Sequence, residues 1–488
     1  MQRLSGLDAS FLYLETPTMH MHVALVAVLD PAKMPNGYDF ERVYRFIDQN
    51  VRTQPQLLRR LVEVPLKIDH PVWLEEPHFD PLHHVRRVEC PAPGGEQELS
   101  ALVGRIMSTP LDRGRPLWEA WVIEGLAGGQ FALVAKVHHA ITDGIAGTQI
   151  LSALFSASPD AEPKQVAPRG ESDEDEVPSE IDLLRDAVLA RIARPKEIVR
   201  MFKRTSNALF DLYERRKDPD HAAGATVFDS PRTRWNGPLT SQRSTAFARV
   251  SADDIKTIRK PFGASANEVV LAICAGALRS YLEAKGELPL APLIAACPIA
   301  TRVRGTTANK VSAMVTSLAT NLESPAERLR TIRAVTRNAK QEHDALGGDL
   351  IRSWAELMTP GLVTTAARLY SKYRLSELHR PMFNLMISNV PGPRVPIYFA
   401  GAELVAAYPL GPISEGAGLN ITVFSYAKHV DFGFVTSPSL IEDLDVLAAL
   451  IPEAAHELLI ASASAALAAA ESPAGVTVAA EEQKLPLG

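Results

Sequence analysis

The sequence predicts an α/β protein with mixed sheets covered by helices and arranged in two lobes. The chain has 488 residues, enough for two or three units of ordinary domain size. Strand-like segments alternate with helical patterns through the second half of the chain. Two irregular stretches, 158–180 and 218–242, interrupt the apolar periodicity and separate the lobes.

The composition excludes several classes of protein. Hydrophobic residues make up 46% and charged residues 22%, which argues against a disordered, collagen-like or coiled-coil chain. The 51 basic and 57 acidic residues nearly balance, so electrostatic binding of nucleic acid by the surface as a whole is not expected. Cys90, Cys274 and Cys297 lack zinc-ligand or disulfide spacing, which fits a reducing compartment. No secretory signal or bilayer-spanning apolar run is visible, so any membrane contact is expected to be peripheral.

We divide the chain into four segments. Residues 1–155 are assigned to an N-terminal lobe and residues 243–460 to a C-terminal lobe. The linker 156–242 lies between the lobes. Residues 461–488 are rich in alanine and are expected to end in a flexible tail.

The linker contains a basic segment, 181–217, whose apolar residues recur at helical spacing around Pro195. Because proline suits the first turn of a helix, we predict two helices here. Two interpretations are open. An amphipathic, basic helix pair can lie on an anionic membrane, or it can be a solvated surface that packs on a lobe.

Serine caps mark the helix starts of the second lobe. Ser265 and Glu268 form a predicted capping box, and Ser324 precedes a proline and Glu327 in the same pattern. Runs of branched residues in this lobe predict strands, which together indicate a mixed sheet. The predicted strands are 293–297, 311–318, 384–387, 421–426 and 430–435.

The most informative segment is 130–154, where a strand pattern changes to a helix pattern at Asp143 and Gly144. Side chains alternate along a strand, so the adjacent His138 and His139 are expected to point to opposite faces, with His139 on the apolar face. A lone histidine there is most often a core residue with one hydrogen bond. The string HHAITDG adds an aspartate and a glycine at a strand end, where a turn can expose a functional group.

A histidine at such a strand end can act as a general base. Burial lowers an imidazole pKa from its usual value near 6.5, so the ring is neutral at working pH. No G-x-S-x-G turn or cysteine nucleophile motif is present, which favours direct acyl transfer between two bound substrates. We interpret the pair His83-His84, which has no following Asp-Gly, as structural. No metal site is expected, since adjacent histidines diverge on a strand, and no glycine-rich nucleotide loop occurs.

Four motifs together resemble the bacterial wax ester synthase/diacylglycerol acyltransferase family. This family is a branch of the HHxxxDG acyltransferases, which are related to chloramphenicol acetyltransferase and to condensation domains. The motifs are LSGLDASFLYLETPT at 4–18, PLDRGRPLWE at 110–119, HHAITDG at 138–144 and NVPGP at 389–393. Three motifs depart from the family pattern: Asn267 is followed by glutamate instead of aspartate, Arg302 ends PIATR instead of PVSxR, and Ala308 replaces the usual glycine before Asn309.

The resemblance implies two chloramphenicol-acetyltransferase-like lobes with a tunnel between them, which acyl-CoA and a lipid alcohol enter from opposite sides. His139 would be the catalytic base and His138 would support it. Asp143 would pair with a basic residue, for which Arg302 is the candidate, or would only cap the following helix. The remaining candidates are Gly144 in the turn, Asn267 as an oxyanion donor, and Pro116, Leu117 and Trp118 along the tunnel or in the core.

Three functions are open at this point. The resemblance implies an enzyme that makes triacylglycerol from acyl-CoA and diacylglycerol, or one that makes wax esters from fatty alcohols by the same mechanism. A catalytically weak lipid-binding protein is the third function, and the intact HHAITDG string disfavours it. No cofactor is implied, because acyl-CoA is a substrate. The expected location is cytoplasmic, with peripheral association to the inner membrane or to lipid droplets.

Overall fold

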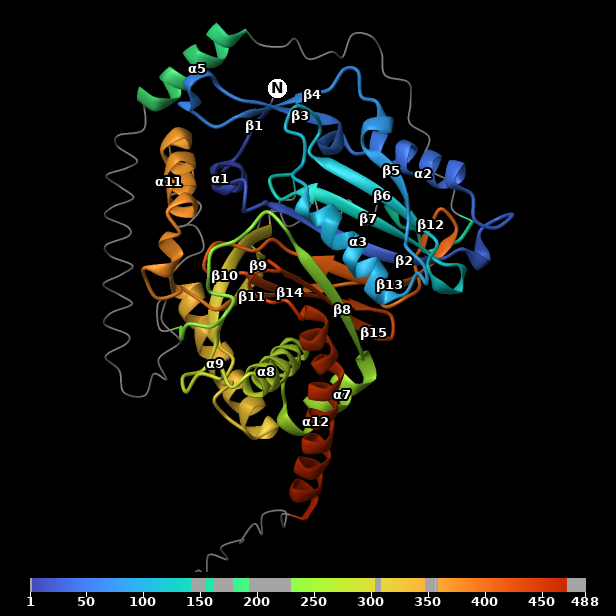
Figure 1. The fold of residues 1–488 in the computed structure, drawn as a ribbon, viewed down its shortest axis with the longest axis vertical. Coiled ribbons are helices and arrows are strands. Elements are labelled where there is room, and N and C mark those ends of the chain that lie inside the picture. Colours follow the sequence, from blue (N-terminus) through green and yellow to red (C-terminus); the bar gives the residue numbers. More distant parts are fainter. Residues whose placement is uncertain are drawn as a thin grey trace, which may run out of the picture.

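The computed structural model describes residues 2–141, 154–160, 179–192, 230–302, 309–346, 356 and 359–471. This part of the chain forms two six-stranded sheets and a small three-stranded sheet. Both large sheets carry helices, so the predicted α/β class is confirmed (Figure 1).

The first six-stranded sheet belongs to the N-terminal lobe. Helices α1 (Gly6–Leu14) and α2 (Phe40–Arg52) share an apolar cluster with one face of this sheet. Helix α3 (Glu96–Ser108) packs against the other face. In sheet order the strands are β12 (Tyr398–Phe399), β13 (Ala402–Leu410), β2 (His22–Asp30), β7 (Phe131–His138), β6 (Trp118–Glu124) and β5 (Val85–Glu89).

Strands β12 and β13 correct the predicted division into lobes. They come from the C-terminal half of the chain, yet β13 pairs antiparallel with β2 in the sheet of the N-terminal lobe. A strand pattern in the sequence shows that a segment is extended, but it does not show which sheet supplies the partner. The C-terminal lobe therefore donates part of its chain to the first lobe.

The second six-stranded sheet forms the C-terminal lobe. Strand β11 is parallel to both of its neighbours and the other pairings are antiparallel, so the predicted mixed sheet is confirmed. All five strands predicted in this lobe are present. In sheet order the strands are β10 (Asn309–Ser317), β9 (Ile294–Arg302), β11 (Leu385–Pro391), β14 (Leu419–Tyr426), β15 (His429–Thr436) and β8 (Ser244–Ser251).

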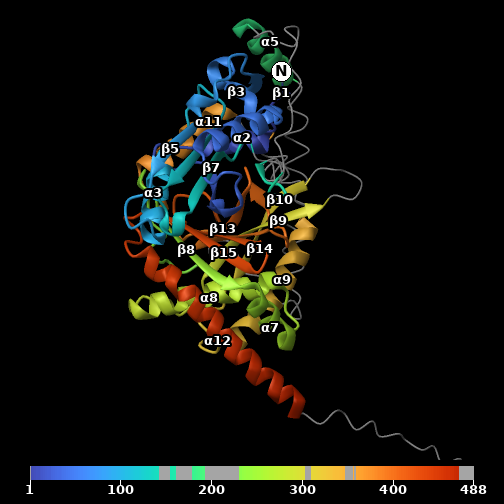
Figure 2. The same ribbon diagram turned by 90° about the vertical axis from the view of Figure 1, so that its right-hand side faces the viewer.

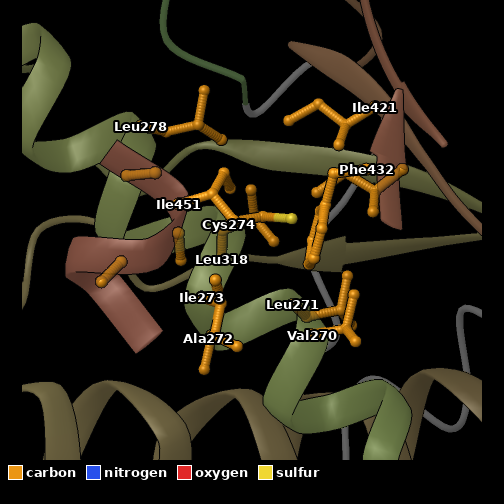
Figure 3. Packing of buried hydrophobic residues seen from close by; sticks show 14 of the residues in the cluster. Val270, Leu271, Ala272, Ile273, Cys274, Leu278, Leu318, Ile421, Phe432 and Ile451 are labelled. Carbon is orange, nitrogen blue, oxygen red and sulfur yellow. The ribbon is translucent and has the colours of Figure 1, made fainter. Parts of the chain in front are cut away.

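Four helices cover this second sheet and enclose the core of the lobe. They are α7 (Ala252–Phe262), α8 (Ala266–Ala284), α9 (Pro325–Leu346) and α12 (Leu444–Glu471). Figure 3 shows Cys274 and Leu278 of α8 facing Ile451 of α12 and Phe432 of the sheet. Helix α8 begins at the predicted capping box, in which Ser265 Oγ accepts from the Glu268 N–H at 3.2 Å and the Glu268 carboxylate accepts from the Ser265 N–H at 2.7 Å.

Helix α12 includes the first part of the alanine-rich end of the chain. The alanine-rich segment continues the helix to Glu471, because alanine has the highest helix propensity, and it projects away from the lobe (Figures 1 and 2). By length and composition, its portion 444–468 could cross a bilayer. The first half of the helix instead packs into the core through Leu447, Ile451 and Leu458.

The third sheet lies at the other end of the molecule, near α5 (Glu180–Ile192) and α11 (Pro360–Lys372) (Figure 1). Leu183 of α5 packs with Val72 and Leu74 of this sheet. The first predicted linker helix therefore lies against a lobe, and the rest of the segment 181–217 falls outside the described residues. The strands are β1 (Gln2–Arg3), β4 (Val72–Glu75) and β3 (Arg59–Val62).

Candidate active site

The two adjacent histidines are fixed by their backbones at the end of β7. The His138 N–H donates to the Leu117 carbonyl oxygen at 2.9 Å, from the residue before β6. The His139 N–H donates to the Met21 carbonyl oxygen at 2.8 Å, from the residue before β2. The neighbouring strands thus hold both residues where the sheet ends.

The imidazole of His139 lies against an aromatic ring. It stacks on Phe11 of α1, with the ring centroids 4.0 Å apart and the planes inclined by 21°. Burial lowers the pKa of His139 to about 4. The ring is therefore neutral at pH 7, the protonation state in which an imidazole nitrogen can accept a proton.

His138 has different neighbours, as the alternation of side chains predicts. Its buried ring accepts the Ala140 N–H at Nδ1, with a distance of 3.1 Å. Because Nδ1 accepts, Nε2 carries a proton, and it lies 3.7 Å from Oε2 of Glu15. This arrangement gives His138 a fixed orientation and a carboxylate neighbour.

Glu15 and Arg113 complete this arrangement, and sequence reasoning missed both. Arg113 Nη2 donates to Glu15 Oε2 at 2.7 Å, and the Met21 N–H donates to Glu15 Oε1 at 3.3 Å. Burial alone would raise the pKa of Glu15, but His138 and Arg113 outweigh it and lower this pKa to about 2. Since the Met21 carbonyl accepts from His139, Glu15 positions His138 directly and His139 through the backbone of Met21.

Replacing Glu15 by glutamine should change the acid stability of the protein. A carboxylate whose folded pKa is about 2 stabilises the fold above its unfolded pKa of 4.5, and this contribution disappears as the pH falls towards 2. The shift corresponds to about 3 kcal/mol. We therefore expect Glu15→Gln to be less stable than wild type at pH 7 and to lose less further stability between pH 4.5 and 2, measured by chemical denaturation at each pH.

Glu63→Gln is the matched control, because the Glu63 side chain is 45% exposed and, within the described part of the chain, forms ion pairs with Lys67 at 3.0 Å and with Arg113 at 3.8 Å. Its stability should follow the wild-type pH dependence. Parallel pH curves for Glu15→Gln and wild type would contradict the assigned ion pair.

Further polar residues near the histidine pair were also missed by the sequence analysis. His20 and His22 stack at 5.5 Å between centroids, and Nε2 of His22 contacts the Met107 carbonyl oxygen at 2.9 Å. Lys136 is fully buried, and its Nζ donates to the Ile106 carbonyl oxygen at 3.0 Å. The alternation in Met-His-Met-His at 19–22, just before and at the start of β2, is the signal that could have indicated His20 and His22.

A cavity of about 620 Å³ opens beside this network. Glu15 and His20 lie in its wall, which connects it to the histidine pair. Apolar and polar residues from α1, the 108–113 loop and α11 share the lining, so it could admit an acyl or glyceride chain with a polar group at one end. Its other described lining residues include Leu12, Tyr13, Leu61, Val64, Leu111 and Thr364.

Several predicted site residues lie where the structure does not test their roles. Asp143 and Gly144 fall outside the described residues. Arg302 ends β9, opposite Asn309 of β10, and its side chain is likewise not described. The predicted pair of Asp143 with Arg302 therefore stays a prediction.

Asn267 is exposed in the first turn of α8. Its Oδ1 accepts a hydrogen bond from Nδ2 of Asn389 at 3.2 Å. The structure thus joins two of the motif asparagines that the sequence analysis quoted separately. The amide group of Asn267 keeps its own donors for another partner, so a role in oxyanion binding stays a prediction.

Pro116, Leu117 and Trp118 are absent from the described lining of the 620 Å³ cavity. Leu117 and Trp118 lie in the apolar core, and Trp118 Nε1 donates to the Leu57 carbonyl oxygen at 2.8 Å. Pro116 and Trp118 border a separate cavity of about 210 Å³. Core packing is therefore the role that the structure gives to Leu117 and Trp118, and a tunnel role for the three residues stays a prediction.

His84 stacks on Trp118, with the ring centroids 4.5 Å apart, and its Nδ1 contacts the Trp118 carbonyl oxygen at 2.8 Å. This packing is what the structural interpretation of the pair His83-His84 requires.

Solved structures with the same fold include an acyltransferase and a condensation domain. The wax ester synthase/diacylglycerol acyltransferase from Marinobacter aquaeolei VT8 matches with a TM-score of 0.67 and 26% identity, covering 95% of this chain and 100% of that chain. The starter condensation domain of rhizomide synthetase, in complex with C8-CoA and Leu-SNAC, matches with a TM-score of 0.53 and 13% identity, covering 95% of each chain. The second match shows the fold alone. The fold and the histidine pair define a two-lobed, chloramphenicol-acetyltransferase-like protein of the HHxxxDG class.

The chain belongs to the wax ester synthase/diacylglycerol acyltransferase family. The family's catalytic-domain model matches residues 4–270, and its C-terminal-domain model matches residues 307–459. A Mycobacterium tuberculosis (strain CDC 1551 / Oshkosh) protein, named as a candidate diacylglycerol O-acyltransferase, is 38% identical over 94% of this chain and 90% of its own length. A second protein with this name, from strain H37Rv, is 34% identical over 91% of this chain and 92% of its own length. The resemblance found in the sequence is confirmed.

Proposed function

We propose that this protein is an O-acyltransferase that moves a long-chain acyl group from acyl-CoA to diacylglycerol and forms triacylglycerol. The observation that carries the proposal is the half-buried, neutral imidazole of His139 at the end of β7. A cavity of about 620 Å³ has Glu15 in its wall, and Glu15 lies 3.7 Å from the adjacent His138. The names of the M. tuberculosis relatives favour diacylglycerol as the acceptor. The Marinobacter structure, whose name joins both activities, makes a fatty alcohol the second candidate acceptor.

In the proposed reaction, neutral His139 takes the proton of the acceptor hydroxyl as the oxygen attacks the thioester carbonyl. The carbon–oxygen bond forms first and yields a tetrahedral oxyanion. This intermediate then collapses, the carbon–sulfur bond breaks, and the imidazolium returns the proton to the departing CoA thiolate. His139 ends each turnover neutral, so no cofactor is required.

Direct transfer is supported by the environment of the cysteines. All three cysteines are buried, and burial raises the pKa of Cys297 to about 12 and raises the pKa values of Cys90 and Cys274. Their thiols therefore stay protonated and are poor nucleophiles at pH 7. An acyl group thus has no activated cysteine to carry it, and the acceptor hydroxyl attacks acyl-CoA itself.

The other motif residues are proposed to support this reaction. Asp143 would pair with Arg302 and fix the turn after the histidines, with Gly144 completing that turn. Asn267 would donate a hydrogen bond to the oxyanion. We further propose a cytoplasmic enzyme that associates peripherally with the inner membrane or with lipid droplets, where its acceptor and product dissolve.

A parallel assay with two acceptors tests the proposed function. Purified protein receives a long-chain acyl-CoA together with diacylglycerol in one reaction and hexadecanol in another, and triacylglycerol, wax ester and free CoA are quantified. We expect triacylglycerol and CoA to form in equal amounts with diacylglycerol. Ester formation with hexadecanol alone would assign the wax ester activity instead, and CoA release without either ester would contradict both.

A further inference from the structure

Helix α11 carries apolar side chains on its outer face. Leu362 is 71% exposed and Tyr373 is 62% exposed, and Ala366 and Leu369 lie between them at helical spacing and are exposed too. An ordinary surface helix presents polar residues to water and apolar residues to the core. The outer face of α11 reverses this pattern.

The inner face of α11 is fixed to the protein by polar groups. Ser371 Oγ contacts Thr18 Oγ1 and donates to Glu415 Oε1, both at 2.8 Å. Thr364 and Arg368 border the 620 Å³ cavity. Because these contacts set the rotation of the helix, the apolar residues cannot turn inward without breaking them.

The short 3-10 helix η3 (Pro65–Lys67) extends the same apolar surface. Leu66 is 83% exposed, and its φ of 59° places a non-glycine residue in the left-handed region. Such a conformation costs free energy. Lys67 lies beside the start of α11, since a side chain at Gly361 would come within 3.8 Å of the Lys67 carbonyl oxygen. Leu66, Leu362, Ala366, Leu369 and Tyr373 form what we call the docking face.

Basic side chains accompany the docking face. The two charged residues of α11, Arg368 and Lys372, are both basic. The acids Glu63 and Glu377 are paired with Lys67 and Arg374 at 3.0 and 2.7 Å, so these four charges cancel and leave Arg368 and Lys372 as the basic residues of the face. Helix α5, which contacts η3, exposes Asp182, Arg185 and Asp186. Apolar side chains bordered by positive charge are typical of segments that bind at the interface of an anionic membrane.

We propose that the docking face binds an anionic lipid surface and holds the 620 Å³ cavity open towards it. Lys67, Pro360 and Arg368 belong both to the lining of the cavity and to the elements that carry the docking face. A lipid acceptor could therefore pass from the surface into the cavity without crossing water. This inference rests on the proposed function for the nature of the acceptor, and it names the surface that would supply it.

The far end of α12 provides a matched control. It also exposes apolar residues, Ile460 and Leu467, but it projects from the opposite end of the molecule (Figures 1 and 2). A flat lipid surface cannot contact the docking face and the end of α12 at the same time. The control variant removes two exposed apolar side chains, against three at the docking face, and the two variants differ in position.

The experiment measures partitioning of the full-length protein into vesicles. The probes are phosphatidylcholine vesicles with and without phosphatidylglycerol, for wild type, for Leu66→Ser/Leu362→Ser/Leu369→Ser, and for Ile460→Ser/Leu467→Ser. We expect wild type to prefer the anionic vesicles, the triple variant to partition at least tenfold more weakly, and the α12 variant to bind as wild type does. Turnover is then measured with diacylglycerol in the vesicles and with a short-chain diacylglycerol in free solution.

The two acceptors separate failure of docking from failure of the proposed function. The docking inference predicts that the triple variant loses turnover on the vesicles but keeps wild-type turnover on the soluble acceptor. Wild type that is inactive on both acceptors contradicts the proposed function, whereas the partition data still decide the docking inference. Wild-type partitioning of the triple variant overturns the inference. Three other results would also overturn the inference. The first is equal binding of wild type to both kinds of vesicle, and the second is conversion of a dimer to a monomer by the triple substitution. The third is a lower melting temperature of the triple variant with unchanged partitioning.

Discussion

His139→Ala should lower the rate of acyl transfer by about 10²–10⁴-fold, because general-base assistance contributes about that factor. The structure places the neutral imidazole of His139 against Phe11 and anchors its backbone on Met21, so the substitution removes the proton acceptor and keeps the strand end. The measurement is the rate of ester formation in a single turnover. Circular dichroism and an acyl-CoA binding titration should match wild type.

His138→Ala is the comparison that distinguishes the two histidines. His138 is buried beside Glu15 and accepts the Ala140 N–H, so its loss should destabilise the fold while reducing acyl transfer less than the His139 substitution does. Should His139→Ala retain more than about a tenth of wild-type turnover, the assignment of the base would be wrong. The same conclusion follows if His138→Ala is the more damaging substitution in a fully folded protein.

Asp431→Ala should lower the free energy of unfolding by about 2–3 kcal/mol, less than the cost of breaking a fully buried ion pair, because the Arg249 side chain is 29% exposed and can be solvated. The buried Asp431 carboxylate accepts from Arg249 Nε at 2.6 Å and from the Ala407 N–H at 2.9 Å. Arg249 Nη2 also donates to the Val405 carbonyl oxygen at 2.9 Å. These contacts fix the crossing strand β13 to the C-terminal sheet, so the variant loses an attachment between the lobes.

Asp253→Ala is the control for this substitution. Asp253 pairs with Lys256 at 2.8 Å on the solvent side of α7, with 78% of its side chain exposed. Its removal should leave the denaturation midpoint unchanged, because exposed ion pairs contribute little. A midpoint for Asp431→Ala equal to that of Asp253→Ala would show that the buried pair does not hold the lobes together.

Local patterns in the sequence predicted the elements of the C-terminal lobe well. Ser265 and Glu268 form the capping box that starts α8, because the motif needs only residues within one turn. The strands β14 and β15 also follow from their own branched residues. Helix starts and strands that depend on residues close together in the chain could therefore be predicted from the sequence.

Long-range contacts could not be predicted in this way. Strand β13 joins β2, a partner from the opposite half of the chain, and no local pattern carries that information. The same reason explains why Glu15 was missed: it follows the end of α1, and only the fold brings it to His138 and Arg113. The histidine pair itself was predicted because its spacing and its motif are contiguous in the sequence.

A single turnover with protein in excess over a labelled long-chain acyl-CoA tests the central claim, direct transfer with His139 as the base. Before acceptor is added, the acyl-CoA should stay intact and the protein mass should stay unchanged. After diacylglycerol is added, triacylglycerol and CoA should appear together in equal amounts, and His139→Ala should slow both equally. Label that attaches to the protein before the acceptor arrives, or ester formation at the wild-type rate by His139→Ala, would contradict the account.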